Sequence, residues 1–217
     1  MGLDFDVDRL RIMTSALASD ALDRLGRRNQ AVSSTIRPLR PRYRLIGRAL
    51  PVSVVATDEM PDEPYAQEMR AVELIRQGDV PVYVTAPEVQ AAVWGELFSL
   101  AARGRGAVGA IVDGPIRDAE AIASLEFPVF CRSFSPLDTM GRAVVDTIGE
   151  EIVCGGTTVR RADYVVADED GIVIIPAELA NDVVELVEEK LKGEHGARSH
   201  LLDGKSVRDV WETWGVF

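Results

Sequence analysis

The chain has 217 residues, of which 47% are hydrophobic and 27% charged, the composition of an ordinary globular protein with a full core. Lys and Arg number 24 against 35 Asp and Glu, and the net charge of −11 repels nucleic acid and anionic membranes, so we expect neither as a partner. No apolar run could span a bilayer, and the N-terminus lacks the basic and apolar blocks of a secretory signal, which favours the cytoplasm. We expect one domain over residues 1–217.

The first expected elements are a helix, an extended connector and a long strand. The helix runs from Thr14 to Gly26, a suitable cap and a suitable stop. Its inward face would be formed by Leu17, Ala21, Leu22 and Leu25. Prolines keep Arg37–Pro41 extended. Arg44–Thr57 is predicted to be a long strand, broken or bulged near Gly47 and Pro51.

Helix, turn and strand then alternate, which predicts parallel strands joined by right-handed crossovers. An acidic loop at Thr57–Pro64, expected to be solvated surface, precedes them. The inward face of the first helix would carry Ala66, Met69, Val72 and Ile75. The expected helices are Tyr65–Arg76, Leu97–Arg103 and Asp118–Leu125, and the strands are Val80–Pro87, Val108–Val112 and Phe127–Cys131.

The second half of the sequence indicates antiparallel strands followed by helices. The expected strands are Arg142–Gly149, Ile152–Cys154, Thr157–Val159, Tyr164–Ala167 and Ile172–Ile175. Pro176 would start a helix from Ala177 to Lys192. A further helical tail, Ser199–Trp214, has apolar residues to bury on its own domain or, at even odds, on a neighbouring subunit. The fold predicted is α/β with a mixed sheet and a helical C-terminal extension at about residues 177–217.

Two helix starts lie at the ends of consecutive crossovers, and in an open α/β sheet such ends share the rim where ligands bind. The first, Gly95-Glu96-Leu97, offers unpaired backbone N–H groups to an anion. At the second, the guanidinium of Arg117 suits a carboxylate and Asp118 suits a hard divalent cation, which together would bind a 2-oxo acid and stabilise an enolate. For the Arg-Asp dipeptide alone, a helix cap beside a surface ion pair is the stronger explanation.

Other catalytic arrangements are not indicated. His195 and His200 lie late in the chain and are interpreted as surface or interface residues, so no His and Cys cluster suits a metal. Cys131 and Cys154 are expected to be reduced and buried. The sequence also lacks support for a nucleophilic triad or a phosphate-binding loop.

An ordered set of short motifs covers nearly the whole chain. They are SDALDRLG (Ser19–Gly26), Gly47–Ala49, QGDVPVYV (Gln77–Val84), WGEL (Trp94–Leu97), GAVGAIVDGPIRD (Gly106–Asp118), CGG (Cys154–Gly156), ADEDGIVIIP (Ala167–Pro176) and a closing DVWETWGVF. In this order they resemble the RraA-like family. That family includes the 4-hydroxy-4-methyl-2-oxoglutarate aldolases, or class II pyruvate aldolases, which also decarboxylate oxaloacetate.

The resemblance implies an α/β/α sandwich of the swivelling type, assembled as trimers or hexamers. It implies a Mg²⁺ or Mn²⁺ ion held by Asp118 and waters, with Arg117 in contact with the substrate. The backbone amides of Gly95–Leu97 would receive the pyruvate carboxylate, and Asp113 would orient Arg117. In some members a glutamate from the C-terminal helix of a neighbouring subunit assists catalysis.

Glu189 and Glu194 are the candidates for that glutamate here, and neither is assigned. The sequence departs from the family pattern in three places, which bear on the substrate rather than on the metal site. TAPEVQAAV precedes WGEL without the usual Gly-Asp pair, Arg160–Asp163 stands where a Pro-Gly-Asp turn is usual, and the loop Thr57–Pro64 differs.

We therefore predict a metal-dependent lyase that cleaves or decarboxylates a 2-oxo acid, of the 4-hydroxy-4-methyl-2-oxoglutarate or oxaloacetate type, through a pyruvate enolate. The alternative from another class is a non-catalytic regulator that binds a ribonuclease or RNA helicase, since the family also includes inhibitors of RNA degradation. Dehydration or other enolate chemistry on a sugar acid would use the same site. The sequence leaves open the physiological substrate, the general base, the preferred metal and the choice between trimer and hexamer.

Overall fold

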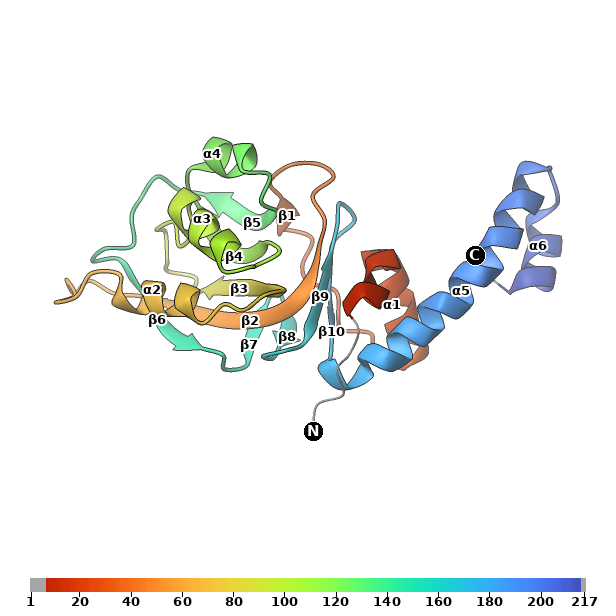
Figure 1. The fold of residues 1–217 in the computed structure, drawn as a ribbon, viewed down its shortest axis with the longest axis horizontal. Coiled ribbons are helices and arrows are strands. Elements are labelled where there is room, and N and C mark those ends of the chain that lie inside the picture. Colours follow the sequence, from red (N-terminus) through yellow and green to blue (C-terminus); the bar gives the residue numbers. More distant parts are fainter. Residues whose placement is uncertain (1–6, 216–217) are drawn as a thin grey trace.

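The computed structural model describes residues 7–215; residues 1–6 and 216–217, the two ends of the predicted domain, lie outside that range. A curled sheet with strand order β1-β5-β4-β3-β2-β9-β10 organises the chain, and β6 pairs with β2 as well (Figure 1). The helices are η1 (Val7–Ile12), α1 (Ser15–Arg24), α2 (Ala66–Glu73), α3 (Glu96–Gly104), α4 (Ala119–Ser124), η2 (Ala177–Leu179), α5 (Ala180–Leu202) and α6 (Val207–Trp214). The strands are β1 (Arg37–Pro38), β2 (Leu45–Ala56), β3 (Asp79–Thr85), β4 (Ala110–Ile116), β5 (Val129–Phe134), β6 (Ala143–Ile148), β7 (Ile152–Cys154), β8 (Thr157–Val159), β9 (Tyr164–Ala167) and β10 (Ile172–Ile175). The predicted mixed α/β fold is confirmed.

The parallel half of the sheet is β2-β3-β4-β5, joined by the crossover helices α2, α3 and α4 on one face (Figure 1). Apolar side chains from these strands and helices form one core under the helices, with Leu50, Val52 and Trp94 among its buried members. The alternation of helix and strand along the sequence predicted this half correctly, because each crossover buries one helical stripe against the sheet.

The long strand β2 joins the two halves of the sheet. It pairs in parallel with β3 and antiparallel with β9 and β6. The bulges predicted near Gly47 and Pro51 are wrong, because the register shift falls between Ser53 and Val54 where β2 meets β6. Gly47 instead permits close packing, since a Cβ there would lie 2.5 Å from the carbonyl oxygen of Gly78.

The opposite face of the sheet is closed by the β7–β8 hairpin over a second core. Cys154 belongs to this core and Cys131 to the one under the helices, so the two thiols lie on different faces of the sheet. Both are free and buried, as predicted. Burial raises the pKa of the Cys131 thiol to about 11, so it stays protonated at neutral pH.

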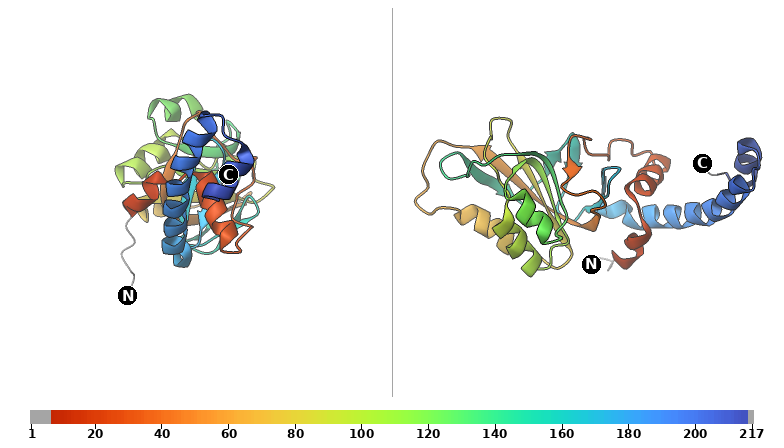
Figure 2. Two further views of the ribbon diagram at one scale, coloured as in Figure 1. Left: turned by 90° about the vertical axis from the view of Figure 1, so that its right-hand side faces the viewer. Right: turned by 90° about the horizontal axis from the view of Figure 1, so that it is seen from above.

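The C-terminal helices form an arm that projects from the body of the molecule (Figure 2). The first part of α5 packs with α1 on β9 and β10, and α6 folds back on the distal end. The predicted helix end at Lys192 is wrong, because α5 continues to Leu202 through Gly193 and Gly196. Gly196 leaves room for the Trp214 ring of α6, which a Cβ would overlap. No helix within residues 7–215 is long and apolar enough to cross a membrane.

Two further details of the parallel half, one in α2 and one in β4, differ from the sequence prediction. Met69 was expected to face inward on α2, but its side chain is 50% exposed, and Glu68 is buried with Ala71 and Val72 instead. The predicted strand Val108–Val112 is also shifted, because β4 begins at Ala110 and continues through Ile116. The site residues that follow β4 therefore lie at a strand end.

Candidate functional site

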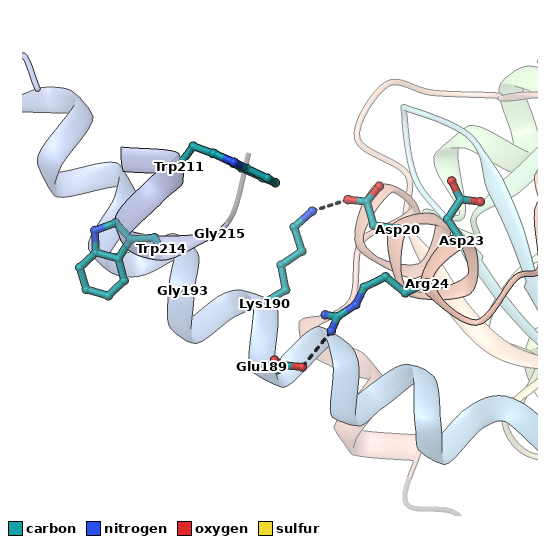
Figure 3. A pocket seen from close by; sticks show the side chains of 9 residues that line it. All are labelled: Asp20, Asp23, Arg24, Glu189, Lys190, Gly193, Trp211, Trp214 and Gly215. Carbon is teal, nitrogen blue, oxygen red and sulfur yellow. Dashed lines mark hydrogen bonds and ion pairs between the residues drawn. The ribbon is translucent and has the colours of Figure 1, made fainter. Parts of the chain in front are cut away.

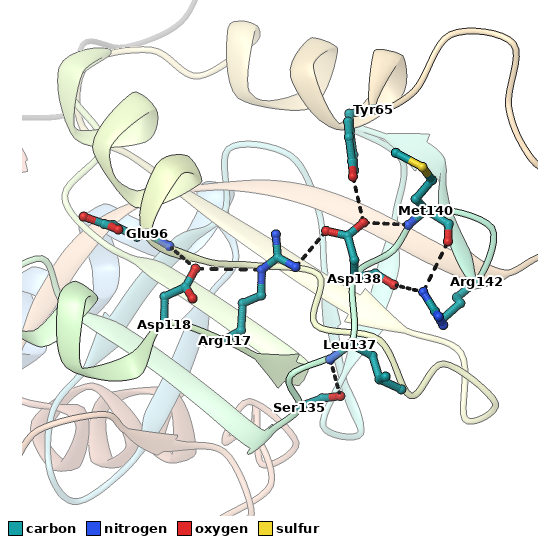
Figure 4. A network of polar contacts seen from close by, with 9 residues as sticks. All are labelled: Tyr65, Glu96, Arg117, Asp118, Ser135, Leu137, Asp138, Met140 and Arg142. Atoms are coloured by element: carbon teal, nitrogen blue, oxygen red, sulfur yellow. Dashed lines mark hydrogen bonds and ion pairs between the residues drawn. The ribbon is translucent and has the colours of Figure 1, made fainter.

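The two helix starts singled out in the sequence lie beside each other at one end of the parallel strands. Trp94 forms a parallel bridge with Ile116, the last residue of β4, and its carbonyl oxygen accepts a 3.0 Å hydrogen bond from the Arg117 backbone N–H. The Glu96 N–H then donates to Asp118 Oδ2 at 3.4 Å (Figure 4). The fold thus places the Gly95–Leu97 turn against the Arg-Asp pair. This contact was expected, because the ends of neighbouring parallel strands lie at one edge of the sheet.

Asp118 occupies the position before α4 without capping that helix. Its backbone is left-handed, with φ 58°, and its carboxylate makes no hydrogen bond to an α4 N–H. The side chain turns toward the start of α3 instead and is 46% exposed. The helix-cap explanation of this aspartate therefore does not hold. Its carboxylate is available to a ligand on the open side.

Arg117 is held by two carboxylates. Its Nε lies 3.8 Å from Asp118 Oδ2, and its Nη1 lies 2.7 Å from Asp138 Oδ2 (Figure 4). Asp138 follows β5 in a loop and was not among the residues singled out in the sequence. Its role had no local signal, because a lone aspartate in an irregular segment has no periodicity or spacing that relates it to Arg117.

The prediction that Asp113 orients Arg117 is wrong. Asp113 forms an ion pair with Arg132 and accepts a 2.6 Å hydrogen bond from the Gly155 N–H. Asp113 belongs to β4, whereas Arg117 follows the last residue of that strand, where strand alternation no longer sets the side-chain direction. Asp113 faces the β7–β8 hairpin, whereas Arg117 lies beyond the strand end on the side of α3.

An open pocket of about 570 Å³ lies in front of the Arg-Asp pair. Its lining residues are Ile116, Arg117, Asp118, Ala119, Phe134, Ser135 and Pro136. The Gly95–Leu97 turn, which contacts Asp118 through the Glu96 N–H, is supported by buried side chains. Trp94 Nε1 donates to Ser99 Oγ at 2.8 Å, and Ser99 Oγ donates to the Gly95 carbonyl oxygen at 3.0 Å. This support holds the start of α3 beside Asp118, to which the Glu96 N–H donates.

A single carboxylate limits the kind of metal that fits. Within residues 7–215 there is no cluster of three His, Cys, Asp or Glu side chains able to hold an ion, so a closed protein cage is excluded there. Mg²⁺ commonly keeps several waters and uses one or two carboxylates together with its substrate. The half-exposed Asp118 carboxylate at an open pocket suits that kind of ion.

Gly95→Ala is expected to damage the site without unfolding the protein. A Cβ on Gly95 would lie 2.9 Å from Asp118 Oδ2 and 3.3 Å from Arg117 Cγ, so both side chains must move. Misplacement of about 1 Å costs up to roughly 100-fold in rate, and we expect kcat/KM to fall by about tenfold or more. The matched control is Gly104→Ala in the same helix, where a Cβ meets no atom within 4 Å. Equal kcat/KM values for the two variants would contradict the geometry.

The glutamates considered as partner-subunit catalysts lie on the arm. Glu189 contacts Arg24 at 3.4 Å (Figure 3). Glu194 forms ion pairs with Lys190 and Arg198. Neither lines the Arg-Asp pocket of its own chain. His200 Nδ1 accepts a hydrogen bond from Trp214 Nε1 at 3.2 Å, which is a packing contact within the arm.

Glu68→Gln is expected to change how stability depends on pH. Burial first, and then the charge of Asp138, raise the pKa of the buried Glu68 carboxyl above its ordinary value. A raised folded-state pKa means that the contribution of this group to stability is complete below its unfolded pKa and is lost as pH rises through the folded value. Urea unfolding should therefore show that the glutamine variant gains stability relative to the parent between pH 4 and pH 8. A constant difference across that range would contradict this.

Comparison with known proteins identifies the family. A family description, "RraA-like: Aldolase/RraA", matches residues 15–174, which include β1–β9, most of β10 and both helix starts of the site. The chain belongs to the RraA-like family, as the ordered motifs indicated.

Individual relatives agree with this assignment. The chain is 30% identical over 201 residues to a Halalkalibacterium halodurans protein named "Putative 4-hydroxy-4-methyl-2-oxoglutarate aldolase", covering 93% of this chain and 90% of that protein. It is similar in structure to Streptomyces coelicolor RraAS2, described as an unusual member of the RNase ES inhibitor RraA protein family, with a TM-score of 0.79, 25% identity and coverage of 91% and 99%. A structure described as one of novel cellulases from gut-associated microbes has a TM-score of 0.85 and 90% coverage of both chains, and at 22% identity it shows the fold alone.

Proposed function

We propose that the protein is a divalent-metal-dependent lyase that cleaves or decarboxylates a 2-oxo acid through a pyruvate enolate. The observation that carries the proposal is an open pocket lined by Arg117 and Asp118, with the Glu96 N–H of the adjoining Gly95–Leu97 turn donating to Asp118. The aldolase name of the Halalkalibacterium relative supports the same chemistry. A 4-hydroxy-4-methyl-2-oxoglutarate or oxaloacetate type of substrate has the two acidic groups that such a pocket suits.

Each group in the pocket has a distinct task in this proposal. Asp118, together with waters, would hold Mg²⁺ or Mn²⁺, and the ion would act as a Lewis acid that stabilises negative charge developing on the substrate. Arg117 binds a carboxylate through the guanidinium edge that remains free of its two aspartates. The N–H groups at the start of α3 receive the pyruvate carboxylate, because the helix dipole favours an anion there.

A pyruvate-release assay over a panel of 2-oxo acids tests the proposed activity. Oxaloacetate and 4-hydroxy-4-methyl-2-oxoglutarate should be turned over with Mg²⁺ or Mn²⁺ and left intact when a chelator is added. The panel also ranks the substrates. We expect this ranking to be specific to this chain, because its sequence departs from the family pattern before WGEL and at the acidic loop. Absence of release from every 2-oxo acid with both metals would contradict the proposal.

We also propose that the protein assembles as a homo-oligomer, a trimer or hexamer, through its C-terminal arm. Lys190 pairs with Asp20, and Glu189 lies 3.4 Å from Arg24, so the first part of α5 is anchored to α1 (Figure 3). The distal part leaves apolar side chains uncovered. They are Leu201, Leu202, Val207, Trp211 and Trp214. Exposed apolar surface with large aromatics is typical of subunit interfaces.

The double substitution Leu202→Glu with Trp211→Glu should lower the oligomer mass in light scattering. Leu202 is 89% and Trp211 54% exposed, so within one chain the changes cost little. A glutamate in place of Val153, which is 59% exposed on the β7–β8 hairpin, is the control and should leave the mass unchanged. An unaltered mass in the arm variant would rule out this interface.

A second candidate function is a non-catalytic regulator of RNA degradation. The likeness to Streptomyces coelicolor RraAS2, an unusual member of the RNase ES inhibitor RraA protein family, favours it. This candidate predicts co-purification with a ribonuclease or RNA helicase and no pyruvate release. The pyruvate-release assay and the co-purification experiment together distinguish the lyase from the regulator.

A further inference from the structure

The carboxylate that contacts Arg117 most closely is not the proposed metal ligand. Nη1 of Arg117 lies 2.7 Å from Asp138 Oδ2, within hydrogen-bond distance, whereas Nε lies 3.8 Å from Asp118 Oδ2. A charge-assisted bond of the first length is strong and directional, and an ion pair at the second distance fixes no orientation. The direction of the guanidinium is therefore set by Asp138.

Asp138 is itself fixed by groups from two other places in the fold. Its Oδ1 accepts a 2.8 Å hydrogen bond from the Tyr65 hydroxyl and a 2.9 Å bond from the Met140 N–H. Burial alone would raise the pKa of the Asp138 carboxyl, but these hydrogen bonds and the one from Arg117 outweigh burial and hold the pKa below its ordinary value. The carboxylate thus stays charged at neutral pH and uses both oxygens.

Tyr65 connects this carboxylate to the segment before α2. It is the residue that precedes α2, immediately after the acidic loop Thr57–Pro64, and its backbone is left-handed with φ 62°. An aromatic residue rarely adopts this conformation, so the surrounding structure must hold it there. The result is a chain of contacts from Tyr65 through Asp138 to Arg117, drawn in Figure 4.

The remaining nitrogen of Arg117 is left for a ligand. Nε faces Asp118 and Nη1 bonds to Asp138, and in Figure 4 the third nitrogen points away from both carboxylates. Rotation of the guanidinium about its stem would spoil this arrangement, and the bond to Asp138 opposes such rotation.

We infer that Asp138, steadied by Tyr65, is a positioning residue that orients Arg117 for the carboxylate of the substrate. The inference deepens the proposed function and rests on it for the identity of the bound acid. It assigns no proton transfer to Asp138. It also gives the segment before α2, where the sequence departs from the family pattern, a direct physical connection to substrate binding.

The test compares Asp138→Asn, Tyr65→Phe and Arg117→Ala with the parent. Asparagine keeps the shape of the side chain and removes its charge, so we expect KM for oxaloacetate to rise by about tenfold, with a smaller fall in kcat, because uniform binding of the acid is what weakens. Tyr65→Phe should give an intermediate rise. The affinity for Mn²⁺ should stay within about twofold of the parent, since Asp118 is intact.

Two controls make the test specific. Glu151→Gln removes a carboxylate from an exposed ion pair with Arg160, at 2.7 Å, and should behave as the parent. In the Arg117→Ala background, Asp138→Asn should have no further effect on KM, because residues that act through one another are not additive. A full additional tenfold rise in that background, or parent-like kinetics of Asp138→Asn alone, would overturn the inference.

Binding of oxalate in the presence of Mn²⁺, measured by calorimetry, separates this inference from the proposed reaction. If the parent turns over no 2-oxo acid but binds oxalate, and Asp138→Asn and Tyr65→Phe weaken that binding, the lyase proposal fails and the inference stands. If the parent binds no oxalate, or the variants bind it as tightly as the parent, the inference fails. Loss of Mn²⁺ affinity in Asp138→Asn equal to the loss of oxalate affinity would also overturn it, because Asp138 would then act on the metal.

Discussion

Asp118→Ala is expected to reduce metal-dependent pyruvate release from oxaloacetate by at least about 100-fold, because stabilisation by a metal of developing charge is worth several kcal/mol. Within residues 7–215, Asp118 is the one carboxylate that lines the pocket, so we expect no second ligand from this part of the chain to compensate. Mn²⁺ titration should show a parallel loss of binding. Arg117→Ala should differ in kind, since it raises KM while Mn²⁺ affinity is retained.

Glu120→Ala is the matched control for Asp118→Ala. Glu120 lies in the first turn of α4, two residues from Asp118, and its side chain is exposed and absent from the pocket. Its removal tests whether any loss of negative charge near the helix start lowers activity. Turnover by Asp118→Ala at the rate of Glu120→Ala would show that Asp118 holds no essential ion.

Trp94→Ala is expected to lower the free energy of unfolding by about 3–5 kcal/mol, the usual cost of truncating a large buried aromatic residue. Trp94 is 1% exposed, and its ring centroid lies 5.2 Å from that of Tyr83 and 6.0 Å from that of Phe98. Its indole N–H also supports the Gly95 turn through Ser99. Urea unfolding monitored by far-UV circular dichroism gives the value.

Phe134→Ala provides the comparison for Trp94→Ala, because Phe134 is 63% exposed. Removing it should cost well under 1 kcal/mol, as for most exposed side chains. If the two variants lose similar stability, Trp94 is not a central part of the core. Trp94→Phe should lie between them, since it keeps a ring and loses the donor to Ser99.

The sequence predicts those parts of the fold that depend on local periodicity. The strands Ile152–Cys154, Thr157–Val159, Tyr164–Ala167 and Ile172–Ile175 have in the structure the bounds expected from their apolar runs and turns. The two helix starts were also expected to meet, because the ends of consecutive parallel crossovers share a rim.

The sequence does not predict features set by contacts between distant residues. On α2, Glu68 is buried and Met69 is exposed, the reverse of the prediction. The helix is turned about its axis by about one residue relative to the predicted inward face, and eight residues are too few for the apolar pattern to fix that orientation. The path of α5 through Gly193 and Gly196 depends on the Trp214 ring packing against Gly196.

The candidate site divides in the same way. Arg117 and Asp118 are adjacent in the sequence, so their shared position was predictable. The contacts of Arg117 were not. Asp113 is only four residues away but faces the other side of the sheet, whereas Asp138 lies after the next strand and bonds to Arg117. Regular strand alternation would put residues 113 and 117 on one face. The register shift of β4 between Val112 and Pro115 and the path of the loop after β5 decide between the two aspartates, and only the folded structure shows these.

Exchange of the methyl protons of pyruvate with deuterium oxide, followed by proton NMR, tests the central claim most directly, because it reports enolate formation whatever the physiological substrate is. The account predicts loss of the methyl signal in the presence of the protein and Mg²⁺ or Mn²⁺, and retention of the signal with chelator or with Asp118→Ala. A methyl signal that decays no faster with the parent protein and either metal than without protein would contradict it.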